Sequence, residues 1–372
     1  MNSKLFISKK KIEYKILLLI FLIGAFINDF KYERNIDSQF ISIFIKKIDE
    51  IYYQNGFVNL NEVESKININ KWKTDNNKSN EINIGIGIDK NYFLQAMMTL
   101  ASVMDSQQSE KRIRFHIALV KDFQISDMIK IYSLRKKIRN ETEFNFYNAS
   151  KIEKDLMGLN TKGPGAVSRL LLPKLIPNDI NRLLLLDTGD LLVIRDLTEL
   201  FDWDMKNNII VGVPDTRIGQ KSIITKQIYK SYINLGSSLI NVKLYKSDNV
   251  YEKLVKYKNY YHSYCGDQDL LNDILIGKIG MYPIKFGQYS LFKNDDTPLI
   301  PNYYNKNLEL LFPQNKTEYL KSGYIPFIIH QWNSKWNKGF GLTIFRRIAQ
   351  YYIRYAGIWE EICKKFPGYC IK

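Results

Sequence analysis

Two carboxylates interrupt an otherwise apolar stretch of the chain, which reads LLLLDTGDLLVIRDL at 183–197. They are Asp187 and Asp190, and they follow a run of leucines typical of a strand that is buried on both faces. Burying a charge without a partner is costly, and a divalent cation removes that cost while bridging the carboxylates to a diphosphate. The other interpretation is a plain turn, because Thr-Gly flanked by Asp is good turn chemistry. The pattern alone leaves both open.

Three further segments place small or polar residues where chemistry could occur. Gly236 lies in YINLGSSLINV, where small residues permit close approach of a ligand, or simply mark a bulged strand. GDQDLLN at 266–272 gathers polar groups at a helix start, where acidic residues are favoured in any case. His330 follows an apolar run and could ligate a metal from a strand end, although a lone histidine is more often structural.

The elements that must position these residues follow from hydrophobic periodicity. Strands are expected at 81–88, 112–120, 143–147 and 182–186, and helices at 93–104, 126–138 and 166–175. Ser126 is the expected cap of the second helix. The β-α-β-α-β order predicts a doubly wound sheet, in which ligands bind outside the carboxyl ends of the strands. Asp89 and Asp187 each follow a strand, so we expect them on one rim of the sheet.

Five segments resemble the motifs of glycosyltransferase family 8, the retaining family of glycogenin-like and galactosyltransferase-like enzymes, and they occur in the family's order. They read INIGIGIDKNYFLQAMMTLASV, SRLLLPKLIP, YINLGSSLIN, GDQDLLN and IIHQW. The resemblance covers residues 81–340 and implies an α/β, Rossmann-like, glycosyltransferase A-type fold. Its central sheet would be mixed and flanked by helices.

The resemblance also implies roles for individual residues. The metal ligands would be Asp187, Asp190 and His330, holding Mn²⁺ or Mg²⁺. The catalytic residues would be Gln268, near the anomeric carbon, and Asp267. The residues that contact the nucleotide-sugar would be Asp89, Asn91, Tyr92, Arg169, Asn234, Gly236 and Lys335.

The chain departs from the family's pattern in two places. The family's Asp-x-Asp becomes Asp-Thr-Gly-Asp, and residues i and i+3 of a strand do not share a face. We therefore expect a bulge at Gly189 that brings Asp187 back toward the metal. The family's Gly-x-x-Lys-Pro-Trp becomes Asn-Ser-Lys-Trp at 333–336, which leaves Lys335 as the candidate for phosphate binding.

The activity that the resemblance implies is transfer of a hexose or pentose from a UDP-sugar to a glycan or glycoprotein acceptor, with retention at the anomeric carbon. No carboxylate is a convincing covalent nucleophile, so same-face attack by the acceptor is favoured. The altered Asp-Thr-Gly-Asp motivates an alternative, a non-catalytic nucleotide-sugar- or glycan-binding protein. A third interpretation places the aromatic and basic residues of 341–365 on anionic lipid. The alternative for this segment is a helix that packs on the domain and is broken near Gly357.

Composition narrows the class of partner. The formal net charge is +16, but lysine, isoleucine and asparagine are abundant throughout, and no basic cluster is interleaved with aromatics as in a nucleic-acid module. We therefore expect no nucleic-acid partner. Cys363 and Cys370 flank a Pro-Gly turn and could form a disulfide in an oxidising compartment or remain free thiols; Cys265 is the third cysteine.

The N-terminus has lysines followed by an apolar run, Ile16–Ile27. A cleaved signal peptide, an uncleaved anchor and a buried helix are all conceivable, and the absence of a clean cleavage site favours the anchor. The lysines then predict a cytosolic N-terminus and a lumenal catalytic domain in the Golgi or endoplasmic reticulum. Sequons at Asn77, Asn140, Asn148 and Asn315 agree with lumenal exposure. The expected division is a tail and anchor at 1–30, a stem at 31–80, the catalytic domain at 81–340 and a helical extension at 341–372.

Overall fold

The structure is a computed structural model, and part of the chain is described. The described residues are 57–59, 80–120, 123–156, 159, 163–215, 217–261, 266–283, 286, 288–289, 327–330 and 344–366. Within them, no helix combines the length and the apolar character that crossing a membrane requires. The apolar run at 16–27 lies outside them, so the anchor, the stem and the location in the secretory pathway stay predictions.

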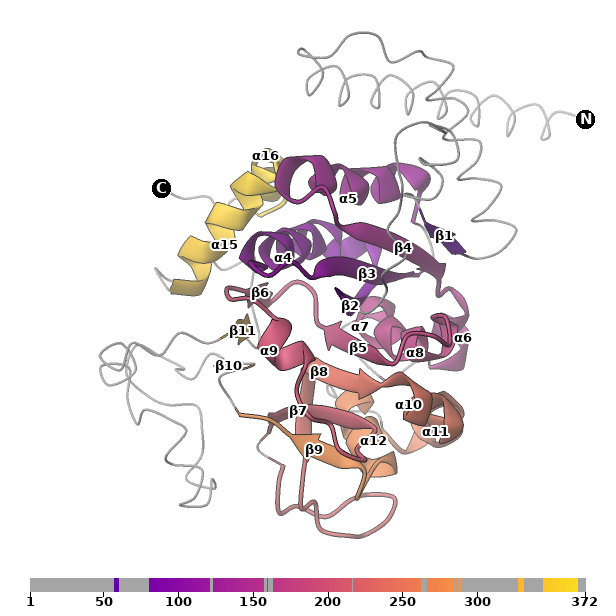
Figure 1. The fold of residues 1–372 in the computed structure, drawn as a ribbon. Helices are drawn as coiled ribbons and strands as arrows, with labels where there is room; N and C mark the ends of the chain where they lie inside the picture. Colours follow the sequence, from indigo (N-terminus) through magenta and orange to yellow (C-terminus); the bar gives the residue numbers. More distant parts are fainter. Residues whose placement is uncertain are drawn as a thin grey trace, which may run out of the picture.

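The centre of the fold is a mixed eight-stranded sheet in the order β1-β4-β3-β2-β5-β8-β7-β9 (Figure 1). Its strands are β1 (Phe57–Asn59), β2 (Glu81–Ile88), β3 (Arg112–Leu119), β4 (Glu143–Asn148), β5 (Arg182–Leu186), β7 (Ile210–Pro214), β8 (Ile233–Asn241) and β9 (Ile279–Met281). Strands β4, β3, β2 and β5 are parallel, whereas β8 runs antiparallel to both β5 and β7. The carboxyl ends of β2, β5 and β7 therefore share one rim.

Helices cover both faces of this sheet (Figure 1). The helices and 3₁₀ turns are η2 (Lys90–Tyr92), α4 (Phe93–Ser106), α5 (Ile125–Ile138), α6 (Lys151–Asp155), α7 (Pro164–Ser168), η3 (Arg169–Leu171), α8 (Leu172–Leu175), α9 (Thr198–Phe201), α10 (Val242–Ser247), α11 (Val250–Tyr257), η4 (Lys258–Tyr260), α12 (Gly266–Ile274), α15 (Ile344–Tyr355) and α16 (Trp359–Lys365). The expected mixed α/β sheet flanked by helices is confirmed.

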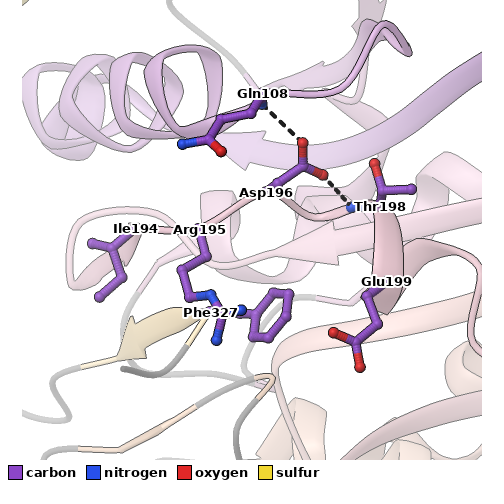
Figure 2. A pocket seen from close by; sticks show the side chains of 7 residues that line it. All are labelled: Gln108, Ile194, Arg195, Asp196, Thr198, Glu199 and Phe327. Carbon is purple, nitrogen blue, oxygen red and sulfur yellow. Dashed lines mark hydrogen bonds between the residues drawn. The ribbon is translucent and has the colours of Figure 1, made fainter. Parts of the chain in front are cut away.

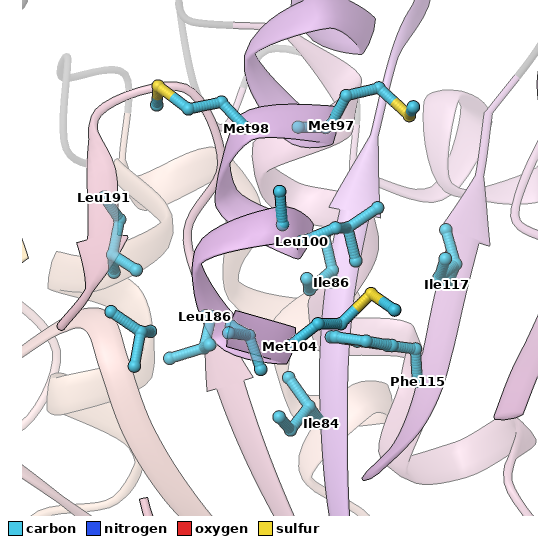
Figure 3. Packing of buried hydrophobic residues seen from close by; sticks show 14 of the residues in the cluster. Ile84, Ile86, Met97, Met98, Leu100, Met104, Phe115, Ile117, Leu186 and Leu191 are labelled. Carbon is cyan, nitrogen blue, oxygen red and sulfur yellow. The ribbon is translucent and has the colours of Figure 1, made fainter. Parts of the chain in front are cut away.

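Alternating side chains of the strands feed two apolar cores, one on each face of the sheet. In β5, Leu184 and Leu186 pack in the core beneath α4, while Leu183 and Leu185 pack in the core on the opposite face. Figure 3 shows the first core, in which Leu100 and Met104 of α4 lie over the strands. Burial on both faces explains why β5 reads as an unbroken run of leucines.

Two expectations about the helices were wrong in detail. The cap of α5 is Gln124, not Ser126: the Gln124 N–H donates to the carboxylate of Asp127 at 3.0 Å, and the helix begins at Ile125. The helix expected at 166–175 is three short pieces, α7, η3 and α8. Pro173 lacks the N–H that would continue an α-helical ladder from Arg169, so a tighter turn forms there.

A smaller three-stranded sheet, in the order β10-β11-β6, lies beside the main one (Figure 1). Its strands are β6 (Leu191–Val193), β10 (Gln288–Tyr289) and β11 (Ile328–His330), and β11 pairs antiparallel with β6. The C-terminal helices pack on the domain, because Tyr352 and Ile353 of α15 and Ile362 of α16 join the core beneath α4. Gly357 separates the two helices with a φ of +73°.

A buried histidine lies within the sheet. His116 on β3 is 1% exposed; its Nε2 lies 3.0 Å from Asn83 Oδ1, and its Nδ1 lies 2.9 Å from the Tyr147 hydroxyl. Since the Asn83 oxygen can only accept, Nε2 carries the proton and Nδ1 accepts from Tyr147. Burial, aided by the charge of Arg114, lowers the pKa of His116 from 6.5 to about 3.

This histidine is expected to make the fold acid-sensitive. As the pH falls from 6.5 toward 3, the unfolded chain gains a proton at His116 that the folded chain excludes, so the free energy of unfolding decreases. The loss is on the order of 4 kcal/mol by pH 3. Urea unfolding from pH 7 to 4 measures it. His116→Gln, which keeps hydrogen-bonding groups but does not titrate, should show a shallower pH dependence. Equal slopes for both proteins would contradict the assignment.

Candidate metal and diphosphate site

The segment between β5 and β6 turns sharply and brings its two aspartates to one side. Leu186 ends β5, Leu191 begins β6, and Gly189 between them has a φ of +101°. A Cβ at Gly189 would lie 3.1 Å from Cδ1 of Tyr92, so both the conformation and the space favour glycine. The expected bulge within a strand is thus replaced by a turn between two strands. The turn solves the same problem, because residues i and i+3 can converge across it.

His330 reaches the same place through strand pairing. The register of β11 on β6 sets His330 opposite Leu191, next to Asp190 in the chain. One ligand atom from each of Asp187, Asp190 and His330 lies within 4.8 Å of the others, and Asp190 Oδ1 is 3.2 Å from His330 Nε2. Asp190 Oδ1 is buried and makes no hydrogen bond in the described part of the chain. Two carboxylates, one of them with this buried oxygen, and an imidazole are a ligand set that suits a divalent cation.

Gly236 is what lets the histidine approach. A Cβ there would lie 2.2 Å from Cε1 and 2.4 Å from Nδ1 of His330, closer than any side chain permits. The carbonyl oxygen of Gly236 also accepts from the Asp187 N–H at 2.8 Å. Gly236 therefore lies against both Asp187 and His330, and the space it leaves is filled by the imidazole of this chain.

Gly236→Ala is expected to weaken Mn²⁺ binding about 10- to 100-fold, the range seen when a metal ligand loses its orientation. The added methyl group would push the His330 ring away from Asp190. Titration calorimetry with Mn²⁺ measures the affinity. Ser238→Ala is the matched control on the same strand, because its buried hydroxyl makes no hydrogen bond among the described residues. Unchanged Mn²⁺ affinity in Gly236→Ala would contradict the role of His330.

Arg169 is buried between two aspartates beside this cluster. Its NH1 donates to Asp187 Oδ1 at 2.6 Å, and its NH2 lies 3.8 Å from Asp267 Oδ2. Burial alone would lower the pKa of Arg169, but Asp187, Asp267 and Asp190 together raise it above its ordinary value. The guanidinium therefore stays charged, and its buried Nε–H makes no hydrogen bond in the described residues.

Gln268 lies at the centre of a polar network on the same rim. Its Oε1 accepts from Asn234 Nδ2 at 2.8 Å, and its Nε2 donates to Asp215 Oδ2 at 3.1 Å. Asn272, one turn further along α12, bonds both backbone groups of Ile233 at 2.8 Å and so fixes the helix against β8. The side chain of Gln268 is therefore held in one orientation.

Asp215 is a residue of this site that the sequence interpretation missed. It follows the apolar run of β7, whose carboxyl end lies on the same rim as that of β5. The rule that selected Asp89 and Asp187, an acid directly after a buried strand, would have selected Asp215 as well. Besides Gln268, its carboxylate accepts from Asn234 at 3.3 Å.

Asp89 lies on the expected rim, and backbone groups surround its carboxylate. Oδ1 accepts from the N–H groups of Asn91 at 2.9 Å and Tyr92 at 3.2 Å, and Oδ2 accepts from Gly165 at 3.3 Å. Asp89 thus caps η2 and holds Asn91 and Tyr92 in place. Tyr92 is 36% exposed and lies against Gly189 in the turn at 187–190. Lys335 lies outside the described residues.

A separate cavity of about 450 Å³ lies at the other end of β6 (Figure 2). It is lined by Gln108, Ile194, Arg195, Asp196, Thr198, Glu199 and Phe327. The Arg195 guanidinium lies 4.2 Å from the centre of the Phe327 ring, and Asp196 accepts from the backbone of Gln108 and Thr198, both at 2.8 Å. No residue of the metal cluster lines this cavity, so the two sites are distinct.

Comparison with known families agrees with this geometry. A profile described as Glycosyl transferase family 8 matches residues 83–322. The chain belongs to glycosyltransferase family 8. The matched span includes most of β2, the turn at 187–190 and α12, and the resemblance inferred from the five motifs is confirmed.

Two bacterial relatives of the family match part of the chain. A Haemophilus influenzae protein with a provisional glycosyltransferase name is 29% identical over 212 residues, covering 54% of this chain and 61% of the relative. A lipopolysaccharide 1,3-galactosyltransferase of Salmonella typhimurium is 25% identical over 227 residues, covering 57% of this chain and 65% of the relative. The chain thus spans less than two thirds of each relative.

Solved structures confirm the glycosyltransferase A-type fold. The galactosyltransferase LgtC, in complex with donor and acceptor sugar analogs, aligns with a TM-score of 0.55 at 18% identity, over 74% of this chain and 95% of LgtC. The bifunctional glycosyltransferase WbbM aligns with a TM-score of 0.60 at 17% identity, over 98% of this chain and 66% of WbbM. At such identities the likeness shows the fold alone.

Proposed function

We propose that this chain is a retaining glycosyltransferase that moves a hexose or pentose from a UDP-sugar to a glycan acceptor, with Mn²⁺ bound to the diphosphate. The observation that carries the proposal is the convergence of Asp187, Asp190 and His330 beside the buried charge of Arg169. A cation held there supplies Lewis-acid stabilisation of the departing diphosphate. The imidazole ligand favours Mn²⁺ over Mg²⁺, because Mg²⁺ prefers an all-oxygen shell.

Other residues of the chain have proposed roles in stabilising the diphosphate and in positioning the sugar. The two carboxylates alone would repel a diphosphate, so Arg169 contributes a fixed positive charge next to Asp187. We assign Gln268, which Asn234 and Asp215 orient, to the position beside the anomeric carbon of the sugar. The bond from that carbon to the diphosphate oxygen breaks and UDP leaves with the electron pair. The acceptor hydroxyl attacks from the same face and passes its proton to the departing diphosphate oxygen.

The acceptor is proposed from chemistry and from relatives. One relative is named for the transfer of galactose to lipopolysaccharide, which supports a glycan acceptor and makes UDP-galactose the first donor to test. A glycoprotein acceptor, the membrane anchor and a Golgi or endoplasmic reticulum location stay predictions from the sequence. The non-catalytic alternative rests on the spacing of Asp187 and Asp190. The turn at Gly189 brings their ligand atoms close together, which supports the catalytic proposal.

A donor screen tests the proposal. The purified chain is incubated with UDP-galactose, UDP-glucose or UDP-xylose, with and without Mn²⁺, and UDP release and the anomeric configuration of the product are measured. We expect Mn²⁺-dependent release from one donor and retention in the product. Binding of UDP without release or transfer from any donor would support the non-catalytic alternative instead.

A further inference from the structure

The C-terminal helix α16 ends against the turn that carries Asn91 and Tyr92. Its last residue, Lys365, donates from Nζ to the carbonyl oxygen of Asn91 at 2.7 Å. These residues are 274 positions apart in the sequence. The contact therefore depends on how α15 and α16 pack on the domain (Figure 1).

Several interactions hold α16 in this position. Ala349 and Ile353 of the preceding helix α15, and Ala356 directly after it, are buried in the core beneath α4, as is Ile362 of α16. The turn at Gly357 redirects the chain between the two helices. Glu361 of α16 forms an ion pair with Lys130 of α5. Cys363, two residues before Lys365, is disulfide-bonded.

The turn that Lys365 contacts, η2, lies against the candidate metal site. Asp89 caps η2 through the N–H groups of Asn91 and Tyr92, and the Tyr92 ring lies against Gly189 between the two metal-site aspartates. On its other side, η2 is fixed by Lys90, which pairs with Asp127 of α5 at 2.6 Å. Lys365 thus completes the set of contacts that hold η2 at the rim.

The charge of Lys365 also lies near the carboxylate of Asp89. Burial lowers the pKa of Lys365, and the nearby carboxylate of Asp89 partly counters that shift. The neighbouring Lys364 is exposed as well. The two adjacent lysines share the same class of exposure, whereas Lys365 donates to the Asn91 carbonyl, which makes them a matched pair for experiment.

We propose that Lys365 is a positioning residue for the nucleotide of the donor: by bonding the Asn91 carbonyl, it holds η2 where Asn91 and Tyr92 meet the nucleoside. The proposal rests on the proposed function, since it takes the rim at η2 as the nucleotide site. It makes the C-terminal helices part of the donor site, although they lie outside the span matched by the family profile.

Calorimetry of UDP binding in the presence of Mn²⁺ tests the proposal on the full chain. Lys365→Met keeps most of the aliphatic stem and removes the charged donor, and we expect about tenfold weaker UDP binding, in line with the loss of a charged hydrogen bond. Lys365→Arg should restore most of the affinity. Lys364→Met, the matched control, should bind UDP as the wild type does. Thermal unfolding of all three variants should match the wild type, because the Lys365 side chain is largely exposed.

Amide hydrogen exchange supplies a readout without nucleotide. In Lys365→Met we expect faster exchange at Asn91 and Tyr92, whose N–H groups Asp89 caps, and no change in Lys364→Met. Wild-type UDP affinity in Lys365→Met, with a wild-type protein that binds UDP, would overturn this proposal alone. Failure of the wild-type chain to bind UDP at all would overturn the proposed function and, with it, this assignment.

Discussion

Asp190→Asn is expected to reduce the rate of sugar transfer by at least about a thousandfold, since metal-assisted charge stabilisation is worth several kcal/mol. Asp190 is the candidate carboxylate ligand with a buried oxygen that makes no hydrogen bond among the described residues, and that oxygen lies 3.2 Å from His330 Nε2. The amide keeps the size of the side chain but removes the charge that attracts the cation. Initial rates of UDP release at several Mn²⁺ concentrations measure the effect.

Asp202→Asn is the control for this experiment. Asp202 is exposed, pairs with Lys111 and belongs to neither the metal cluster nor the polar network around Gln268, so its loss should leave the rate unchanged. A normal Mn²⁺-dependent rate in Asp190→Asn would contradict its role as a ligand. A rate that recovers fully at high Mn²⁺ would instead show that Asp190 contributes affinity without shaping the transition state.

Arg169→Met is expected to lower the free energy of unfolding by about 3–5 kcal/mol, the usual effect of removing one partner of a buried ion pair. The variant leaves the partly buried Asp187 and the buried Asp267 without the guanidinium that neutralises both. Sugar transfer should also be lost, because the fixed positive charge beside the diphosphate is gone. Urea unfolding at pH 7 and UDP release at low temperature separate the two effects.

Lys174→Met provides the comparison for Arg169→Met. Lys174 and its partner Glu252 are both about half exposed, so the change should cost no more than roughly 1 kcal/mol. If Arg169→Met cost as little as Lys174→Met, the two aspartates near Arg169 would have to be neutral or otherwise compensated. Mn²⁺ would then be a candidate for that compensation, and unfolding in the presence of a chelator would decide it.

The layout of the sheet could be predicted from local pattern because each element carried its own signal. The alternation of Glu81–Ile88 and the leucines of Arg182–Leu186 predict two strands, and parallel strands place the residues after them on one rim. Asp89 and Asp187 were therefore located correctly relative to the sheet. Asp215 was overlooked although the same rule applies to it.

The geometry of the metal cluster could not be predicted, because it depends on pairings between distant segments. The turn at Gly189 requires a positive φ, which a glycine permits, but the presence of a glycine does not predict that it adopts one. The approach of His330 to Gly236 requires the register of β11 on β6 and the packing of that small sheet against β8. Lys365 gave no local signal, since its contact to Asn91 forms only after two helices pack on the domain.

The departure from the family's Asp-x-Asp pattern illustrates how backbone geometry can replace a sequence pattern. On a strand, Asp187 and Asp190 would point to opposite faces. In the structure the strand ends at Leu186, and the turn at Gly189 brings one carboxylate oxygen of each aspartate within 4.8 Å of the other and of His330. A turn formed by one glycine with a positive φ thus compensates for the one added residue between the two aspartates.

Pulsed electron paramagnetic resonance of Mn²⁺ bound to the chain together with UDP tests the central claim most directly. A single ion held by His330 and by the diphosphate should show coupling both to an imidazole nitrogen and to phosphorus. The nitrogen coupling should disappear in His330→Gln. Phosphorus coupling without nitrogen coupling in the wild type, or an identical spectrum in His330→Gln, would contradict a metal site built from Asp187, Asp190 and His330.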